Sequence, residues 1–373
     1  MWLTWRAAMV SALYGPGGFY ARGERPGCHF RTSVHASPRY AGALLILLRE
    51  LDEALGLPDR LDLVDVGAGG GELAGQILAA ADGDPALASR IAVHAVDVAP
   101  RPAGLDPRVR WSSSPPSHIT GLVIASEWLD NVPLDVAELG HGGPRLLLVD
   151  PGSGAEQQGL RPRPADLGWL RRWWPLRRTG ERAEIGRARD LAWAGVVRRV
   201  SRGLAIAADY GHLRTGRPPS GTLAGYLGGR PVPPIPDGSR DVTAHVALDS
   251  CAAAGVAAGA AATLLTTQSE ALRALGLAAR PPAPADAGRD PLGYLTALQA
   301  SGADAVLTDP DGLGGFGWLI QSVGSPLPAS LASCAGLPGF TALPGFTAPP
   351  GFTAPAGRAS PAGRAAALGG GRT

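Results

Sequence analysis

The feature that most constrains the fold is a run of glycines between a short apolar segment and a helical one. Residues 61–66 read Leu-Asp-Leu-Val-Asp-Val, a pattern typical of a buried strand, and Gly67, Gly69 and Gly71 follow directly. Glycine allows positive φ angles and lets the backbone pass close to a ligand. Residues 72–81 then continue with helical periodicity. A strand, a glycine turn and a helix in this order predict a ligand site at the edge of a sheet in an α/β domain.

Strand-like and helical segments alternate along much of the chain. Apolar segments of strand length occur at residues 91–97, 121–125, 203–209 and 316–323. Segments with a helical pattern lie between them, notably residues 40–55, 72–81 and 184–202. This alternation predicts an α/β fold with a mainly parallel sheet that is covered on both faces. We also expect an alanine-rich helix after residue 241 and a short strand at residues 305–307.

The composition divides the chain into three parts. Residues 1–36 are rich in glycine and aromatic residues and are expected to form a loop-rich arm. Residues 37–325 form the predicted domain, with insertions at about 136–182 and 212–300. Residues 326–373 form a Pro/Gly/Ala-rich tail in which Pro-Gly-Phe-Thr-Ala occurs three times with a period of six residues. A segment of this composition is predicted to be disordered, because it cannot build a packed core.

Charge and cysteine content exclude several classes of protein. The formal charge is only +2, so nucleic-acid binding is not expected. No stretch approaches the roughly 20 apolar residues of a membrane span, and the apolar run at residues 7–13 is too short for a signal peptide. We therefore expect a cytoplasmic protein. Cys28, Cys251 and Cys334 lie far apart, which predicts reduced thiols rather than a metal site or a disulfide.

The glycine spacing discriminates between two nucleoside cofactors. A dinucleotide site needs a third glycine where this chain has Glu72, whose carboxylate would repel a diphosphate. S-adenosyl-L-methionine (SAM) carries no phosphate and tolerates a nearby acid, which can pair with its amino group. The next predicted strand also ends in an acid that can accept hydrogen bonds from ribose hydroxyls, although NAD sites share this device. We predict SAM as the cofactor, and the expected contacts are Asp65, Gly67, Gly69, Gly71 and Asp97.

Six short blocks appear in a fixed order along the chain. They are Phe-Arg-Thr-Ser at 30–33, Glu-Trp-Leu-Asp-Asn-Val-Pro at 127–133, Ala-Asp-Tyr-Gly at 208–211, Gly-Thr-Leu-Ala-Gly-Tyr at 221–226, Asp-Val-Thr-Ala-His-Val at 241–246 and Thr-Gln at 267–268. This ordered set resembles the MidA family of class I SAM-dependent methyltransferases, which includes the mitochondrial complex I assembly-factor methyltransferase. The resemblance implies a Rossmann-like class I fold and arginine N-methylation of a protein substrate, a respiratory complex I-type subunit. Ser126 stands where the family usually has Asn.

Three carboxylates are candidates for the chemistry of methyl transfer. Glu127 and Asp130 follow the predicted strand at 121–125, and Asp209 ends the strand at 203–209, so all three are expected at the ligand-binding edge of the sheet. A guanidinium stays protonated, and carboxylates bind it in a bidentate manner. The hypothesis is that Glu127 orients the acceptor, that Asp130 assists or contacts the cofactor, and that Asp209 lines the acceptor pocket. The alternative is that these carboxylates only cap or anchor loops.

Other polar residues allow two interpretations each. Asp241 and His245 are four residues apart and could form a local hydrogen-bonded pair. His245 could instead act as a general base, but a structural role for this histidine is favoured. His29 and Thr32 belong to an arm that could close over SAM. Glu184 is either a second acceptor-binding carboxylate or the acidic first turn of a helix.

The tryptophan-rich segment and the activity itself also have alternatives. Trp169, Trp173 and Trp174 are flanked by Arg residues and are expected to pack inward, the alternative being a docking surface for a partner. The predicted enzyme competes with a non-catalytic or weakly catalytic SAM-binding assembly factor for a protein partner. An NAD-dependent oxidoreductase is a third possibility, which Glu72 disfavours.

Overall fold

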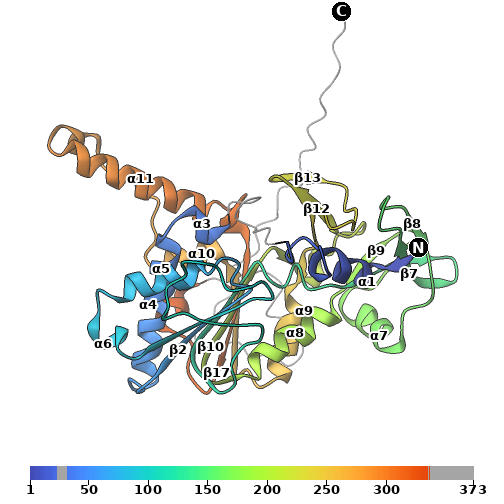
Figure 1. Cartoon of the computed structure of the whole chain (residues 1–373), viewed down its shortest axis with the longest axis horizontal. Coiled ribbons are helices and arrows are strands. Elements are labelled where there is room, and N and C mark those ends of the chain that lie inside the picture. Colours follow the sequence, from blue (N-terminus) through green and yellow to red (C-terminus); the bar gives the residue numbers. More distant parts are fainter. Residues whose placement is uncertain (23–31, 335, 337–373) are drawn as a thin grey trace, which may run out of the picture.

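A seven-stranded sheet in the order β16-β17-β10-β5-β2-β3-β4 forms the centre of the molecule (Figure 1). The computed structural model describes residues 1–22, 32–334 and 336. In chain order the strands are β2 (Leu61–Val66), β3 (Ile91–Val96), β4 (Arg110–Ser112), β5 (Ile119–Ser126), β10 (Val200–Asp209), β16 (Ala262–Thr267) and β17 (Gly317–Val323). The pairs from β4 to β10 are parallel, whereas β17 is antiparallel to both β10 and β16. Without β17, the order is that of doubly wound nucleotide-binding sheets.

Alternate strand residues pack on opposite faces of this sheet. Leu63 of β2 belongs to the apolar core on one face, and its neighbour Val64 belongs to the core on the other face. The covering helices are α4 (Arg39–Ala54), α5 (Glu72–Ala81) and α10 (Gln268–Ala274) on the first face, with α8 (Arg187–Val197) and α9 (Leu248–Ala257) on the second. The sheet is therefore buried on both sides, as the apolar strands predict.

A second sheet lies beside the central one and contains the segment expected to be an insertion at 136–182. Its path is β1-β7-β6-β9, and β8 pairs with β7. The elements are β1 (Leu3–Thr4), β6 (Asp135–Gly140), β7 (Gly143–Val149), β8 (Glu156–Gln158), β9 (Arg182–Ile185) and the helix α7 (Pro164–Trp173). The helix expected at 184–202 begins only at Arg187, because residues 182–185 pair with β6.

The N-terminal segment packs on this second sheet and is not the loop-rich arm that its glycines predict. It forms β1, α1 (Trp5–Met9) and the π-helix η1 (Val10–Tyr14). The Thr4 side chain caps α1 by accepting a hydrogen bond from the backbone of Ala7 at 3.3 Å. Trp5, Met9 and Leu13 are buried, so the apolar run becomes core once a partner sheet is present. The expectations for Cys28 and His29 lie outside the described residues.

The segment expected to be an insertion at 212–300 contains both small sheets and parts of the central fold. The small sheets consist of β12 (Ala224–Leu227), β13 (Arg230–Val232) and β14 (Asp241–Thr243), and of β11 (Gly211–His212) with β15 (Val246–Ala247). In contrast, α9, β16 and α10 cover or extend the central sheet. The strand expected at 305–307 is wrong, because these residues lie in α11 (Pro291–Thr308), which projects from the molecule in Figure 1.

The packed part of the chain continues beyond the boundary expected at residue 325. Leu331 and Cys334 are buried against the core on the α10 face. Residues 335 and 337–373, which contain the repeats for which disorder is expected, lie outside the described residues. The remaining short elements are α3 (Ser33–Ala36), α6 (Pro85–Ala88), η2 (Arg214–Gly216), η3 (Pro284–Gly288), η4 (Leu313–Gly315) and η5 (Ala329–Ser333). None of the helices in the described part of the chain is both long and apolar enough to cross a membrane.

Candidate functional site

The glycine turn joins β2 to α5 at the carboxyl edge of the parallel strands. Gly67, Gly69 and Gly71 have φ angles of 76°, 58° and 78°, a region that other residues rarely adopt. Glu72 is the first residue of α5, and its Oε2 accepts a hydrogen bond from the Gly70 nitrogen at 2.9 Å. This carboxylate stands near the helix N-terminus, where a dinucleotide site would hold diphosphate. The turn therefore suits a cofactor without phosphate.

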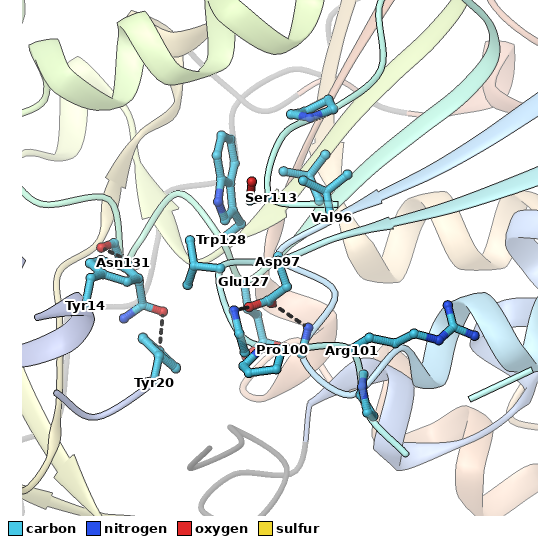
Figure 2. Close-up of a pocket in the computed structure, with 17 residues that line it drawn as sticks. Tyr14, Tyr20, Val96, Asp97, Pro100, Arg101, Ser113, Glu127, Trp128 and Asn131 are labelled. Carbon is cyan, nitrogen blue, oxygen red and sulfur yellow. Dashed lines mark hydrogen bonds between the residues drawn. The ribbon is translucent and has the colours of Figure 1, made fainter. Parts of the chain in front are cut away.

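Two cavities meet at this turn. The larger has a volume of about 450 Å³, within the usual range for small-molecule sites, and is drawn in Figure 2. The smaller has a volume of about 70 Å³, and its walls include Thr32, His35, Asp65 and Glu72. Gly67, Gly69 and Glu127 line both cavities. A ligand seated on the glycine turn can therefore reach into both.

Asp97 follows β3 and lies in the wall of the larger cavity (Figure 2). Its carboxylate accepts hydrogen bonds from the backbone nitrogens of Gly69 and Ala99, each at 2.8 Å. Burial raises the pKa of Asp97, and these backbone hydrogen bonds oppose that rise. The acid thus ties the end of β3 to the glycine turn and also faces the cavity.

Asp65 lies near the end of β2, in the wall of the smaller cavity. No hydrogen bond reaches its carboxylate from a residue that the structure describes, and its exposed fraction is only 4%. Burial, and then the negative charges of Asp97 and Glu72, raise the pKa of Asp65 to about 7. A buried carboxylate without a partner at a cavity wall favours a ligand with a positive charge or a hydrogen-bond donor.

Glu127 stands where the two cavities join, directly after β5. Its φ angle is 51°, and its backbone nitrogen donates to the Ala208 carbonyl at 2.8 Å, which fixes this unfavourable conformation. Burial, and then the negative charge of the nearby Asp130, raise the pKa of Glu127 to about 8. This placement agrees with the expectation of a carboxylate at the ligand-binding edge of the sheet.

Asp130 and Asp209 lie behind Glu127, and neither lines the cavities. Asp209 is fully buried, and its Oδ2 accepts hydrogen bonds from the backbone nitrogens of Leu129 and Asp130 at 3.0 and 3.2 Å. Asp130 Oδ2 accepts hydrogen bonds from the hydroxyls of Thr243, at 2.8 Å, and Tyr210. The expectation that Asp209 lines an acceptor pocket therefore fails on geometry. Its carboxylate is used to anchor the loop.

Arg189 of α8 has no counterpart among the residues predicted from the sequence. Its guanidinium is buried and donates to the carbonyls of Val132, Ala244 and His245 at 3.2, 2.8 and 2.9 Å, and also to that of Asp130. Burial lowers the pKa of Arg189, and the nearby carboxylates, Asp130 first, oppose that effect. One side chain thus joins the loop after Glu127 to the segment around His245. Only its place in a predicted helix was visible in the sequence.

Two tyrosines from the N-terminal segment form the wall opposite the glycine turn. In Figure 2, Tyr14, Tyr20 and Asn131 lie on one side of the cavity and Arg101 on the other, with Asp97 and Glu127 between them. Tyr14 donates to the Asn131 carbonyl at 3.1 Å, and Tyr20 donates to Asn131 Oδ1 at 2.9 Å. The two rings stack with their centroids 5.6 Å apart. The sequence showed this segment only as glycine-rich and aromatic.

The predicted local pair of Asp241 and His245 does not form. Asp241 Oδ1 instead accepts hydrogen bonds from Asn131 Nδ2 at 2.8 Å and from the Tyr20 hydroxyl at 3.2 Å. The His245 side chain is exposed and packs edge-on against Tyr210, with ring centroids 5.3 Å apart. Asp241 therefore supports the tyrosine wall of the larger cavity.

Two further candidates have structural environments away from the cavities. Glu184 lies on β9, not in a helix, and its Oε1 accepts hydrogen bonds from the backbone nitrogens of Thr222 and Leu223 at 2.6 and 3.1 Å. Trp169, Trp173 and Trp174 are buried in one apolar cluster, as the inward-packing interpretation predicts.

The short helix α3 contributes the outer wall of the smaller cavity. Thr32 Oγ1 and His35 Nδ1 lie 2.7 Å apart, and His35 Nε2 lies 3.6 Å from Glu72 Oε1. Thr32, Val34 and His35 line the cavity together with Asp65. Thr32 thus lies at the site, where the hypothesis that the arm closes over SAM would place it.

Comparison with solved structures identifies relatives that share this architecture. A Burkholderia thailandensis protein, crystallised with S-adenosyl-homocysteine, is 26% identical with a TM-score of 0.73, over 89% of this chain and 91% of its own. A native crystal structure of a protein of the same superfamily, also from Burkholderia thailandensis, is 26% identical with a TM-score of 0.69, over 87% and 88% of the two chains. No curated protein sequence matches the chain.

A family profile also matches most of the domain. Residues 45–266 match the family described as "Putative S-adenosyl-L-methionine-dependent methyltransferase". The match contains the glycine turn, Asp97 and Glu127. The chain therefore belongs to this family of SAM-dependent methyltransferases, and its cofactor is SAM.

Proposed function

We propose that this enzyme is a class I methyltransferase of the MidA type, which methylates an arginine side chain of a protein substrate. The strand order, with a single antiparallel strand between β10 and β16, supports the class I assignment. The MidA assignment, and with it a respiratory complex I-type subunit as substrate, rests on the six ordered sequence blocks. The single observation that carries the arginine acceptor is the position of Glu127 at the junction of the two cavities.

The residues around the glycine turn provide contacts for each part of the cofactor. Asp97, at the larger cavity, would accept hydrogen bonds from the ribose hydroxyls. Gly67 and Gly69 leave room for the ligand to cross the turn between the cavities. Asp65, which lacks a described partner, would pair with the amino group in the smaller cavity. When bound, SAM supplies an activated methyl group on a sulfonium.

Glu127 would bind and orient the acceptor. An arginine side chain carries a positive charge, and a carboxylate can hold two of its N–H groups at once. The neighbouring groups Asp97, Asp130 and Asp241 are also acidic, so the surroundings favour a cationic acceptor over an anionic one. Tyr14 and Tyr20 add aromatic faces to the same cavity, which can pack against a guanidinium plane. Fixing the acceptor before reaction reduces the entropic part of the barrier.

The decisive experiment combines labelling with a Glu127→Gln variant. Native protein is incubated with methyl-labelled SAM and cell extract, and the modified residue is mapped by mass spectrometry. We expect labelled methylarginine with the native protein and loss of at least about a hundredfold of that label with Glu127→Gln. In titration calorimetry, the dissociation constants of S-adenosyl-homocysteine for native protein and for Glu127→Gln should agree within about threefold. The exposed Glu53→Gln on α4 serves as a matched control and should retain activity.

Three other outcomes would overturn parts of the proposal. Unchanged turnover in Glu127→Gln would remove the assigned role of Glu127. Label on a residue other than arginine would remove the assigned acceptor. Tight binding of S-adenosyl-homocysteine without any labelled product would favour the alternative of a SAM-binding assembly factor. A parallel titration with NAD should show no binding, because Glu72 occupies the place of a diphosphate.

A further inference from the structure

The smaller cavity is acidic apart from one residue of α3. Its described walls carry the carboxylates of Asp65, Glu72 and Glu127. His35 is the one side chain among the described lining residues that can carry a positive charge. The methionine end of SAM has both an amino group and an α-carboxylate. The acids suit the amino group, whereas in these described walls the carboxylate finds its one cationic partner in His35.

Contacts on both sides of the His35 ring determine which nitrogen carries a proton. Thr32 Oγ1 lies 2.7 Å from His35 Nδ1, and a hydroxyl can either donate or accept. His35 Nε2 lies 3.6 Å from Glu72 Oε1, and a carboxylate only accepts. The arrangement that suits both neighbours has the Thr32 hydroxyl donating to Nδ1 and a proton on Nε2. His35 therefore presents an N–H group at Nε2.

This N–H group has no acceptor at hydrogen-bonding distance among the residues that the structure describes. The 3.6 Å between Nε2 and Glu72 Oε1 is too long for a hydrogen bond. The other oxygen of Glu72 accepts from the Gly70 nitrogen at 2.9 Å, so Glu72 belongs to the glycine turn. The His35 side chain is 34% exposed and lines the cavity. The donor is therefore accessible to a ligand.

Thr32 is placed to hold the His35 ring. It stands at the N-cap position of α3, where a threonine usually accepts a hydrogen bond from the backbone of the first turn. Its side chain nevertheless caps none of the described backbone N–H groups. The hydroxyl faces His35 instead, and only 9% of the residue is exposed. This buried contact fixes the orientation of the ring.

We propose that His35 Nε2 donates a hydrogen bond to the α-carboxylate of SAM, and that Thr32 is a positioning residue that holds the ring for this contact. The smaller cavity then binds a zwitterion, with Asp65 as the partner of the amino group. The N–H group at Nε2 also offsets the negative charge of Glu72, which would otherwise repel a carboxylate. This inference rests on the proposed place of the amino group and assigns the other charged group of the methionine moiety.

Two ligands that differ only in the carboxylate test this assignment. S-adenosyl-homocysteine and its decarboxylated analogue, which keeps the adenosine, the sulfur and the amino group, are titrated into full-length protein by calorimetry. We expect His35→Leu to weaken binding of S-adenosyl-homocysteine about 10–50-fold and binding of the analogue less than about threefold. Because each variant is compared on two ligands, a general change in the cavity would affect both. His141 is exposed and lines neither described cavity, so His141→Leu is the matched control and should change neither affinity.

A second variant tests the positioning role and also decides the matter if His35→Leu does not fold. Thr32→Val removes the hydroxyl that holds the ring but leaves His35 in place. It should weaken binding of S-adenosyl-homocysteine about 3–10-fold and binding of the analogue less than about twofold. Thermal unfolding of each variant shows whether it is folded.

The outcomes separate this inference from the proposed function. Equal losses for both ligands would overturn the inference, because His35 would then act only on the shape of the cavity. Unchanged affinity of His35→Leu for S-adenosyl-homocysteine would overturn it as well. A selective loss of S-adenosyl-homocysteine binding, in a protein that labels no arginine, would refute the proposed acceptor and support the assignment of His35.

Discussion

Asp209 holds the backbone of Asp130, with its Oδ2 3.2 Å from the Asp130 nitrogen. Asp130 was predicted to assist Glu127 or contact the cofactor and Asp209 to line the acceptor pocket, yet Asp209 anchors the backbone of Asp130. The same oxygen also accepts from the Leu129 nitrogen, so it fixes the loop that follows Glu127. Burial raises the pKa of Asp209 well above its usual range, which favours the protonated, neutral form. We therefore expect this acid to act through its acceptor oxygen, without a need for a negative charge.

This geometry predicts that Asp209→Asn and Asp209→Ala behave differently. Asparagine keeps one oxygen that can accept both backbone hydrogen bonds and resembles the neutral acid, so we expect activity within about fivefold of native. Alanine leaves two buried N–H groups without an acceptor, which costs about 2–4 kcal/mol of stability. Steady-state kinetics and chemical denaturation of the two variants give the comparison. Equal losses of activity in both would show that the charge itself is needed.

Asp97 provides a test of the cofactor contacts. Asp97→Ala removes the proposed acceptor of the ribose hydroxyls, so S-adenosyl-homocysteine should bind about 10–100-fold more weakly. Calorimetric titration measures this change. Asp59→Ala, an exposed site near the start of β2, is the control and should leave affinity unchanged. An affinity of Asp97→Ala within about twofold of native would exclude this contact.

Substitution of Gly67 tests whether the turn must lack a side chain at this position. A Cβ atom at Gly67 would lie 2.9 Å from Trp128 Cδ1, and Trp128 lines the larger cavity. Gly67→Ala should displace the indole and weaken binding of S-adenosyl-homocysteine at least about tenfold. Gly104 has a similar φ angle of 81° and no atom within 4 Å of an added Cβ.

Gly104→Ala therefore serves as a control for backbone strain alone. Both substitutions place a side chain at positive φ, at a cost of about 1–2 kcal/mol. Thermal unfolding should detect this cost in both variants, whereas calorimetry should detect a loss of affinity only in Gly67→Ala. The same loss of affinity in Gly104→Ala would attribute the effect to strain.

The raised pKa of Glu127 predicts how stability depends on pH. Its pKa is 4.5 ordinarily and about 8 in the fold, so the folded state binds the proton more tightly than the unfolded state. The free energy of unfolding should therefore fall as pH rises from about 4.5 to about 8. Glu127→Gln cannot ionise and escapes this loss. We expect its Tm to exceed that of the native protein by several degrees at high pH and to approach it at about pH 5.

Circular dichroism melting curves across this pH range provide the measurement. Asp65 shifts in the same direction, with a pKa of about 7 in the fold, so Asp65→Asn should show the same pattern over a window that starts lower. A native protein more stable than Glu127→Gln at high pH would contradict the assigned direction.

Local sequence patterns predicted the central strands correctly, but they failed where packing against other elements decides between strand and helix. The apolar runs at 61–66, 91–97 and 203–209 are buried on both faces, so their sequences alone mark them as strands. Residues 262–267 form β16 next to alanine-rich segments, and their strand pairing with β17 gives no periodic signal. Ala-Val-Leu at 305–307 suits a strand or a helix equally, and helix α11 continues through it.

The sequence predicted those site residues that directly follow a strand. The glycine turn, Asp97 and Glu127 each follow a strand directly, so topology alone brings them to one edge. Tyr14 and Tyr20 reach the same cavity from more than a hundred residues away, by hydrogen bonds to Asn131. No local pattern encodes such a contact. The acids Asp130 and Asp209 were misjudged because residue type and strand end do not reveal whether a carboxylate points to ligand or to backbone.

The tyrosine wall has a consequence for what counts as the minimal enzyme. The region shared with the family profile begins at residue 45, well after Tyr14 and Tyr20, and so contains the turn but not the opposite wall. A variant that lacks only residues 1–22 would keep the glycine turn but lose the tyrosine wall on the opposite side of the cavity. Cofactor retention should thus depend on a segment that lies outside the region matched by the family profile.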